Sequence, residues 1–168
     1  MNNTVLMPIT ELSRRIDVGQ LDPRALTQAF FDRAGGVGRT LNCYIAMDRG
    51  SAMAAAEAAY QRSRAGKRIG PLDGIGIGAK DNIDVAGYPT TNGFGGYFPP
   101  AERDAPVVAR LRAAGAIILG KLNMQEGALG GVTNNAHYGR TTNPHLAHFI
   151  RRSPARAWIG GDEAVGLA

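Results

Sequence analysis

The first 66 residues carry the pattern of three helices and one short strand. A helix is predicted over 10–19, and a second over 22–34, where an Asp-Pro pair supplies a cap and a proline at the first helical position. The segment "GGVGRT" predicts a break, and the apolar "NCYIAM" after it predicts a strand. Asp48 then caps an alanine-rich, strongly helix-forming stretch that Gly66 ends.

The second part of the chain alternates between strands and helices. A glycine-rich strand, "GIGIGAK", lies within 70–97 and runs into the loop "GYPTTNGFGGYFPP". Asp104 is predicted to cap the helix "APVVARLRAAG", Gly115 to stop it, and "AIILG" to form a buried strand. Helix–strand pairs of this kind need crossover connections, so we expect an α/β fold with a mainly parallel sheet.

Composition narrows the function classes. The chain has 168 residues, of which 44% are hydrophobic and 20% charged, which suits one globular domain. The net charge is +5, but the basic residues are dispersed without interleaved aromatic residues, so no nucleic-acid partner is predicted. No apolar run reaches the length of a membrane span, and the N-terminus shows no signal-peptide pattern. We therefore expect a cytoplasmic protein without a membrane partner.

Metal and cofactor patterns are weak. The single cysteine, Cys43, excludes an internal disulfide and predicts a buried, inert thiol. The histidines at 137, 145 and 148 have no carboxylate at a ligand spacing, so no metal site is predicted. "GAIILGKL" nearly matches a phosphate-binding loop, but Leu122 replaces the hydroxyl that magnesium needs. "GIGIGA" has the wrong glycine spacing for a dinucleotide. No cofactor is predicted.

Lys80 is the residue that a structural interpretation explains least well. It ends an apolar strand and is followed at once by Asp81. It can be an edge lysine whose ammonium reaches water. A desolvated lysine can instead act as a neutral general base for a serine hydroxyl. That chemistry also needs a serine and oxyanion donors, which "AKDN" does not supply.

Two blocks, "GPLDGIGIGAKDNIDVAGYPTTNG" and "DAPVVARLRAAGAIILGKLNMQEGALGGVTNNAHYGRTTNP", closely resemble the amidase signature family over residues 5–144. The family includes bacterial amidases, indoleacetamide hydrolases and the amidase subunit of glutamyl-tRNA amidotransferase. The resemblance implies a layered α/β/α fold around a mixed, mainly parallel sheet. It also implies hydrolysis of a small-molecule carboxamide to carboxylate and ammonia by a triad of a serine, a serine in a cis peptide and a lysine. The lysine is Lys80, as the buried end of a proton relay.

The same resemblance gives candidate substrate-binding residues. The loop "GVTNNAHYG" is similar to the family segment that borders the substrate pocket, which makes Thr133, Asn134 and Asn135 candidate lining residues. These three can equally be loop residues that satisfy backbone groups.

The chain departs from the family after residue 144. The family continues into a glycine- and serine-rich segment of the type GGSSGGS, which carries the cis serine, leads to the nucleophile and forms the oxyanion hole. Here the sequence reads "FIRRSPARAWIGGDEAVGLA", and Ser153, its only serine, lies in no glycine-rich context. We assign Ser153 no catalytic role. We therefore expect 1–144 to be the N-terminal portion of an amidase domain and 145–168 a divergent tail.

A frameshift can explain the tail. If Arg151 and Arg152 are encoded CGG CGG, the same bases read one position later give Gly-Gly, the pair that the family places here.

Three functional hypotheses follow. The chain is a truncated, inactive fragment of an amidase, or a non-catalytic binding protein derived from one, or half of a split enzyme that needs a complementing C-terminal half. A homo-oligomer is a further possible assembly. Because parallel sheets need both faces covered, we expect a marginal fold with exposed apolar edges.

Overall fold

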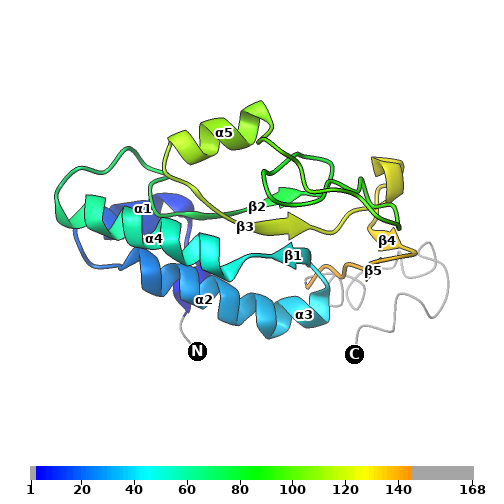
Figure 1. Ribbon diagram of the computed structural model, residues 1–168. Coiled ribbons are helices and arrows are strands. Elements are labelled where there is room, and N and C mark those ends of the chain that lie inside the picture. The colour runs from blue at the N-terminus through cyan, green and yellow to red at the C-terminus, as the bar shows by residue number, and fades with distance from the viewer. Residues whose placement is uncertain (1–2, 145–168) are drawn as a thin grey trace.

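The computed structural model describes residues 3–144 (Figure 1). The helices are η1 (Asn3–Leu6), α1 (Ile9–Asp17), α2 (Pro23–Gly35), α3 (Val37–Leu41), α4 (Arg49–Arg64), α5 (Pro106–Ala113) and η2 (Glu126–Ala128). The strands are β1 (Tyr44–Met47), β2 (Gly76–Lys80), β3 (Ile117–Leu122), β4 (Asn134–Asn135) and β5 (Gly139–Arg140). The predicted helices and strands are thus present in the predicted order. No helix within 3–144 is long and apolar enough to cross a membrane.

The helix caps follow the sequence signals in two cases and differ in a third. Asp22 accepts a hydrogen bond from the Arg24 N–H at 2.8 Å and begins α2, and Asp48 accepts from the Ser51 N–H at 3.0 Å and begins α4. The prediction that Asp104 caps α5 is wrong. Its carboxylate instead accepts from the Ala86 N–H at 2.8 Å, which ties the loop after β2 to the start of α5.

The segment "GGVGRT" also differs from the prediction. The sequence predicts a break, but α3 occupies Val37–Leu41 directly after α2. The non-helical backbone at Gly36 separates the two helices. The break is therefore confined to one residue rather than spread over the segment.

The main sheet has three strands in the order β1-β3-β2. β2 pairs with β3 in parallel, and the connection between these two strands contains the crossover helix α5. β1 pairs with β3 in the antiparallel direction. The sheet is therefore mixed, as predicted. A separate two-stranded sheet joins β4 to β5.

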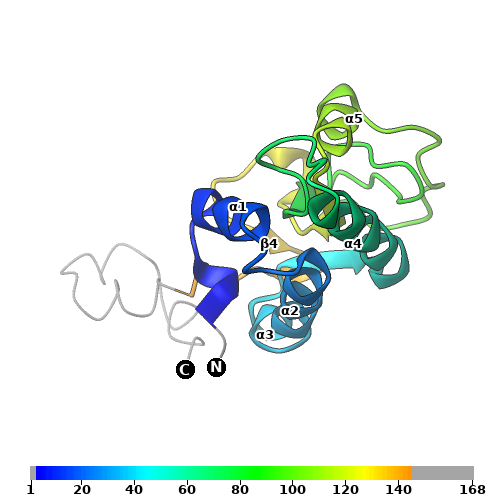
Figure 2. The ribbon, with the colours of Figure 1, turned by 90° about the vertical axis from the view of Figure 1, so that its left-hand side faces the viewer.

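Helices cover both faces of the main sheet. Figures 1 and 2 show α5 on one face and α2 and α4 on the other. The burial pattern agrees, because Ile117 packs with alanines of α4 while its neighbour Ile118 packs with Val108 of α5. This arrangement is the predicted α/β/α layering.

A bulge in β3 interrupts the alternation of its side chains. Residue 118 pairs with 77, but the next pair joins Gly120 to residue 78, so Leu119 has no partner on β2. Gly120 has a φ of +158°, and a Cβ there would lie 2.1 Å from the Ala46 carbonyl oxygen. Without the bulge, Lys121 would share the α4 face with Leu119. With it, Lys121 pairs with Ala79 and faces α5.

Candidate active-site frame around Lys80 and Lys121

Lys80 ends β2 on the face opposite α5. It pairs with Leu122, and Gly78 precedes it on the same face, where a Cβ would approach the Leu122 side chain to 2.9 Å. Lys80 is exposed, and within the described residues its ammonium has no hydrogen-bond or ion-pair partner. The family resemblance implies a buried position, which the described residues do not show, and the exposed side chain matches the edge lysine that the residues by themselves left open. The described part of the chain leaves this end of the face uncovered.

Asp81, the next residue, is completely buried and organises the loop after β2. Its side chain accepts hydrogen bonds from the Thr91 hydroxyl and, at 3.2 Å, from the Gly93 N–H. Its own N–H donates to the Leu122 carbonyl at 3.1 Å, which continues the β2–β3 pairing by one residue. Lys80 is therefore followed by an anchored carboxylate and not by a free loop.

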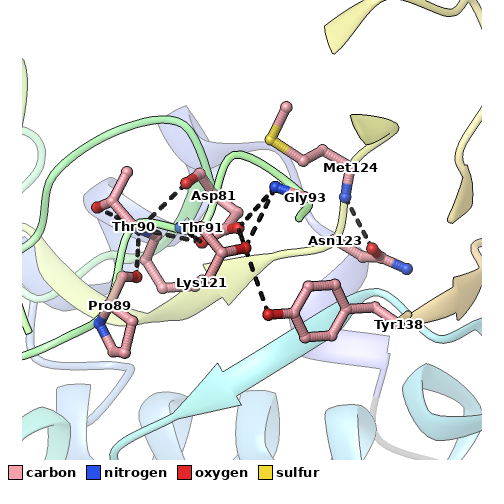
Figure 3. A network of polar contacts seen from close by, with 9 residues as sticks. All are labelled: Asp81, Pro89, Thr90, Thr91, Gly93, Lys121, Asn123, Met124 and Tyr138. Atoms are coloured by element: carbon pink, nitrogen blue, oxygen red, sulfur yellow. Dashed lines mark hydrogen bonds and ion pairs between the residues drawn. The ribbon is translucent and has the colours of Figure 1, made fainter. Parts of the chain in front are cut away.

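Lys121 is the largest fully buried side chain of the described residues. Its Nζ lies 3.3 Å from the Asp81 Oδ1 and donates to the Pro89 carbonyl at 3.0 Å and to the Thr90 Oγ1 at 3.1 Å (Figure 3). Burial lowers the pKa of Lys121 from its ordinary value of 10.5, and the negative charges of Asp81 and Asp84 oppose that shift.

The network reaches the later loops. The Tyr138 hydroxyl donates to the Thr91 Oγ1 at 3.3 Å, as Figure 3 shows. The Asn123 side chain accepts from the Met124 N–H at 2.8 Å and donates to the Gly139 carbonyl at 2.9 Å. These contacts join the ends of β2 and β3 to the segment that carries β4 and β5.

The candidate substrate residues lie in and beside β4. Asn135 is buried and uses its whole amide: its Nδ2 donates to the Gly93 and Met124 carbonyls, and its Oδ1 accepts from the N–H groups of residues 137 and 138. These contacts favour the backbone-satisfying role that the sequence left open. Asn134 is exposed and Thr133 half-buried, and the substrate role of this loop stays a prediction.

Sequence reasoning missed the roles of Lys121 and Asp81. The pattern of "GAIILGKL" raised only the question of a phosphate-binding loop, and the strand that it forms shows that it is not one. The usable signal was a lysine placed directly after an apolar strand run. The same signal drew attention to Lys80, which is exposed.

Metal-binding side chains do not gather in the described residues. Within 3–144, no group of three or more histidine, cysteine or acidic side chains could hold a metal ion. The His137 Nε2 lies 3.1 Å from a Glu126 carboxylate oxygen. Cys43 is half-buried, and burial raises the pKa of its thiol, which keeps it a weak nucleophile. His145, His148 and Ser153 lie outside the described residues.

The fold and these motifs match a known family. A family model described as Amidase matches residues 25–150, so the chain belongs to the amidase family, as the sequence motifs predicted. The match covers the strand that ends in Lys80, the strand that carries Lys121 and the loops between them.

Similar proteins extend well beyond this chain. A glutamyl-tRNA(Gln) amidotransferase subunit of Streptomyces coelicolor is 36% identical over 147 residues, which are 86% of this chain but 29% of that protein. The putative amidase AmiB2 of Mycobacterium tuberculosis is 39% identical over 93% of this chain and 33% of its own length. The solved peptide amidase of Stenotrophomonas maltophilia has a TM-score of 0.75 and 35% identity, covering 83% of this chain and 30% of that one. The chain thus spans about a third of these relatives.

Proposed function

We propose that this chain supplies the general base, Lys80, of an amidohydrolase that converts a carboxamide and water into a carboxylate and ammonia. The observation that supports this most is the placement of Lys80: an amine without a partner in the described residues, at an uncovered strand end, followed by an anchored Asp81. In its neutral form the amine can accept the proton of a serine hydroxyl that attacks the amide carbon.

The nucleophile and the oxyanion donors come from outside these 168 residues. The sequence holds no glycine- and serine-rich segment, and oxyanion donors are worth about 10²–10³ in rate each. We therefore propose that the chain alone has no measurable amidase activity, with 1–144 as the N-terminal portion of the amidase domain and 145–168 as the divergent tail.

The partner that we propose must supply the groups that this sequence lacks, which are the serines and the oxyanion donors. We propose that a complementing C-terminal half of the amidase fold supplies both serines, and that the substrate is a small amide bordered by the loop at Thr133 and Asn134. This chain covers 29% of the similar amidotransferase subunit, so the complementing half corresponds to the rest of that same subunit. We place the protein in the cytoplasm.

Reconstitution tests this proposal. The chain is co-expressed with the remainder of the putative amidase AmiB2 of Mycobacterium tuberculosis, beginning at the position that corresponds to residue 145 of this chain, so that both serines lie in the complementing part. Ammonia release is measured from a panel of aliphatic and aromatic primary carboxamides. We expect neither half to turn over alone and the pair to be active. Lys80→Met should then lower kcat by about 10²–10⁴, the usual worth of a general base.

The matched control is Lys67→Met, which removes another exposed lysine after the end of α4 and should leave the activity unchanged. An active pair that tolerates Lys80→Met contradicts the proposal. Saturable amide binding by the chain alone, without turnover in the pair, would favour the binding-protein hypothesis. Reading the coding DNA from codon 140 in all three frames tests the frameshift separately, since a GGSSGGS segment in another frame is its expected sign.

A further inference from the structure

The position of Lys80 poses an electrostatic problem for a general base. A lysine must be neutral to accept a proton, and a neighbouring carboxylate favours the protonated form. Asp81 follows Lys80 directly and is fully buried, where charges are screened less than in water. An unpaired Asp81 carboxylate would therefore hold Lys80 in the form that cannot act.

The structure pairs that carboxylate from the other face of the sheet. The bulge at Gly120 turns Lys121 toward α5, where its Nζ lies 3.3 Å from the Asp81 Oδ1. The same ammonium donates to the Pro89 carbonyl at 3.0 Å and to the Thr90 hydroxyl at 3.1 Å. Asp84 is the other acidic group whose charge acts on Lys121.

We propose that Lys121 is a positioning residue for Lys80: its buried ammonium balances the charge of Asp81, so that Lys80 can lose its proton, and fixes the loop that begins at Asp81. The inference deepens the proposed function, because it takes Lys80 as the base. Lys121 itself does not touch the substrate, being completely buried. Lys80 is thus the base, and Lys121 is the counter-charge of Asp81, the residue next to Lys80.

The chain has only three lysines, at 67, 80 and 121, and of these Lys67 and Lys80 are exposed, so their labelling can be followed separately in the intact protein. Each amine is acetylated with a trace of acetic anhydride at a series of pH values, and the extent of labelling is read by peptide mass spectrometry. Only neutral amines react, so the pH profile of Lys80 reports its loss of a proton. Lys67, exposed in a loop, is the internal reference.

Lys121→Met should move the Lys80 profile to higher pH by about 0.5 unit or more at low ionic strength, because the buried Asp81 carboxylate beside Lys80 in the chain then has no counter-charge. Labelling of Lys80 near pH 8 should then fall about threefold against Lys67. Asp81→Asn should leave the profile unmoved or lower it. The double variant Lys121→Met, Asp81→Asn should return it to that of the unchanged protein.

A structural role alone would give a different result. Loosening of the loop would perturb Lys80 in both single variants and at least as much in the double variant, and that outcome overturns the proposal. An unshifted profile in a folded Lys121→Met variant also overturns it. Val108→Ala, which removes packing under α5 without a charge, is the matched control and should leave the profile unchanged.

Two further measurements remain decisive if Lys121→Met does not fold. Lys121→Gln keeps a donor for the Pro89 and Thr90 oxygens and removes only the charge, so it should shift the profile as the methionine does. In the unchanged protein, added salt should not move Lys80 relative to Lys67; a shift of Lys80 to lower pH would mean an unbalanced carboxylate and would contradict the proposal. None of these readouts uses amidase activity, so they separate this inference from a failure of reconstitution.

Discussion

The ends of β2 and β3 place two lysines under opposite conditions. Both lysines end apolar strand runs with similar sequences, and Lys80 pairs with Leu122, the residue that follows Lys121. Lys80 is exposed without a partner in the described residues, whereas Lys121 is completely buried beside Asp81. The difference comes from the face that each side chain occupies.

This contrast shows that strand context does not assign a lysine's role. On the α5 face, the loop over 81–93 closes over the strand ends and supplies oxygen atoms for an ammonium. On the other face, the described residues supply none to Lys80. A buried lysine with a carboxylate and carbonyl partners is suited to hold structure and balance charge. An open lysine is suited to meet a substrate or a second protein segment.

The largest effect on the free energy of unfolding is expected when the charge of Lys121 is removed, and only a small one when the charge of Lys80 is removed. Lys121→Met leaves the Asp81 carboxylate buried without a counter-charge, which should lower the free energy of unfolding by about 3–5 kcal/mol. Lys80→Met should change it little, because the side chain is exposed. Urea unfolding followed by circular dichroism measures both. Equal losses in the two variants would remove the contrast between the lysines.

The bulge that separates the two faces can be tested at Gly120. A Cβ there would lie 2.1 Å from the Ala46 carbonyl oxygen, so Gly120→Ala should force β1 away from β3 and cost about 1–3 kcal/mol. At Gly131 nothing lies within 4 Å of such a Cβ, so Gly131→Ala is the matched control with little expected loss. The urea midpoints of the two variants measure the difference in stability. A Gly120→Ala variant as stable as the unchanged protein would mean that the strand register does not depend on this glycine.

The buried ammonium should also make stability depend on pH. Since burial lowers the pKa of Lys121 in the folded state, the unfolded state binds more protons between that pKa and 10.5. Stability should therefore rise with pH in this window, by at most about 1.4 kcal/mol per unit, and should not depend on this group below its folded pKa, where both states bind the proton.

The measurement is the Tm of the unchanged protein and of Lys121→Gln at a series of pH values between 7 and 10. The rise of stability with pH should be lost in the variant. The difference between the two proteins is the quantity to read, because burial raises the pKa of Tyr44 and Tyr88 and these groups act in the opposite direction near pH 10. A variant with the same slope as the unchanged protein would show that Lys121 does not titrate in this range.

The smallest effect is expected at the edge of the network. Tyr138→Phe removes the hydroxyl that donates to Thr91 at 3.3 Å and should cost about 0.5–1.5 kcal/mol. Amide hydrogen exchange around residues 91–93 should rise slightly while exchange in α4 stays unchanged. Exchange that rises equally in both places would indicate a global rather than a local effect.

Much of the fold could be read from local sequence signals. The caps at Asp22 and Asp48 start helices as predicted, because short-range hydrogen bonds to the following N–H groups decide them. Asp104 was mispredicted because its carboxylate bonds to Ala86, a partner 18 residues away that no local pattern reveals. Short α3 was missed because the three glycines of "GGVGRT" argue against a helix, while packing against α2 permits one.

The family, the α/β class, the order of the elements and the choice of Lys80 as a chemical candidate follow from local patterns and motifs along the chain. The exposure of Lys80, the burial of Lys121 and the ion pair of Lys121 with Asp81 depend on contacts between distant segments. The physical reason is the bulge at Gly120: one extra residue in β3 exchanges the two faces of the sheet, and that shift is set by pairing with other strands rather than by the chain's own pattern.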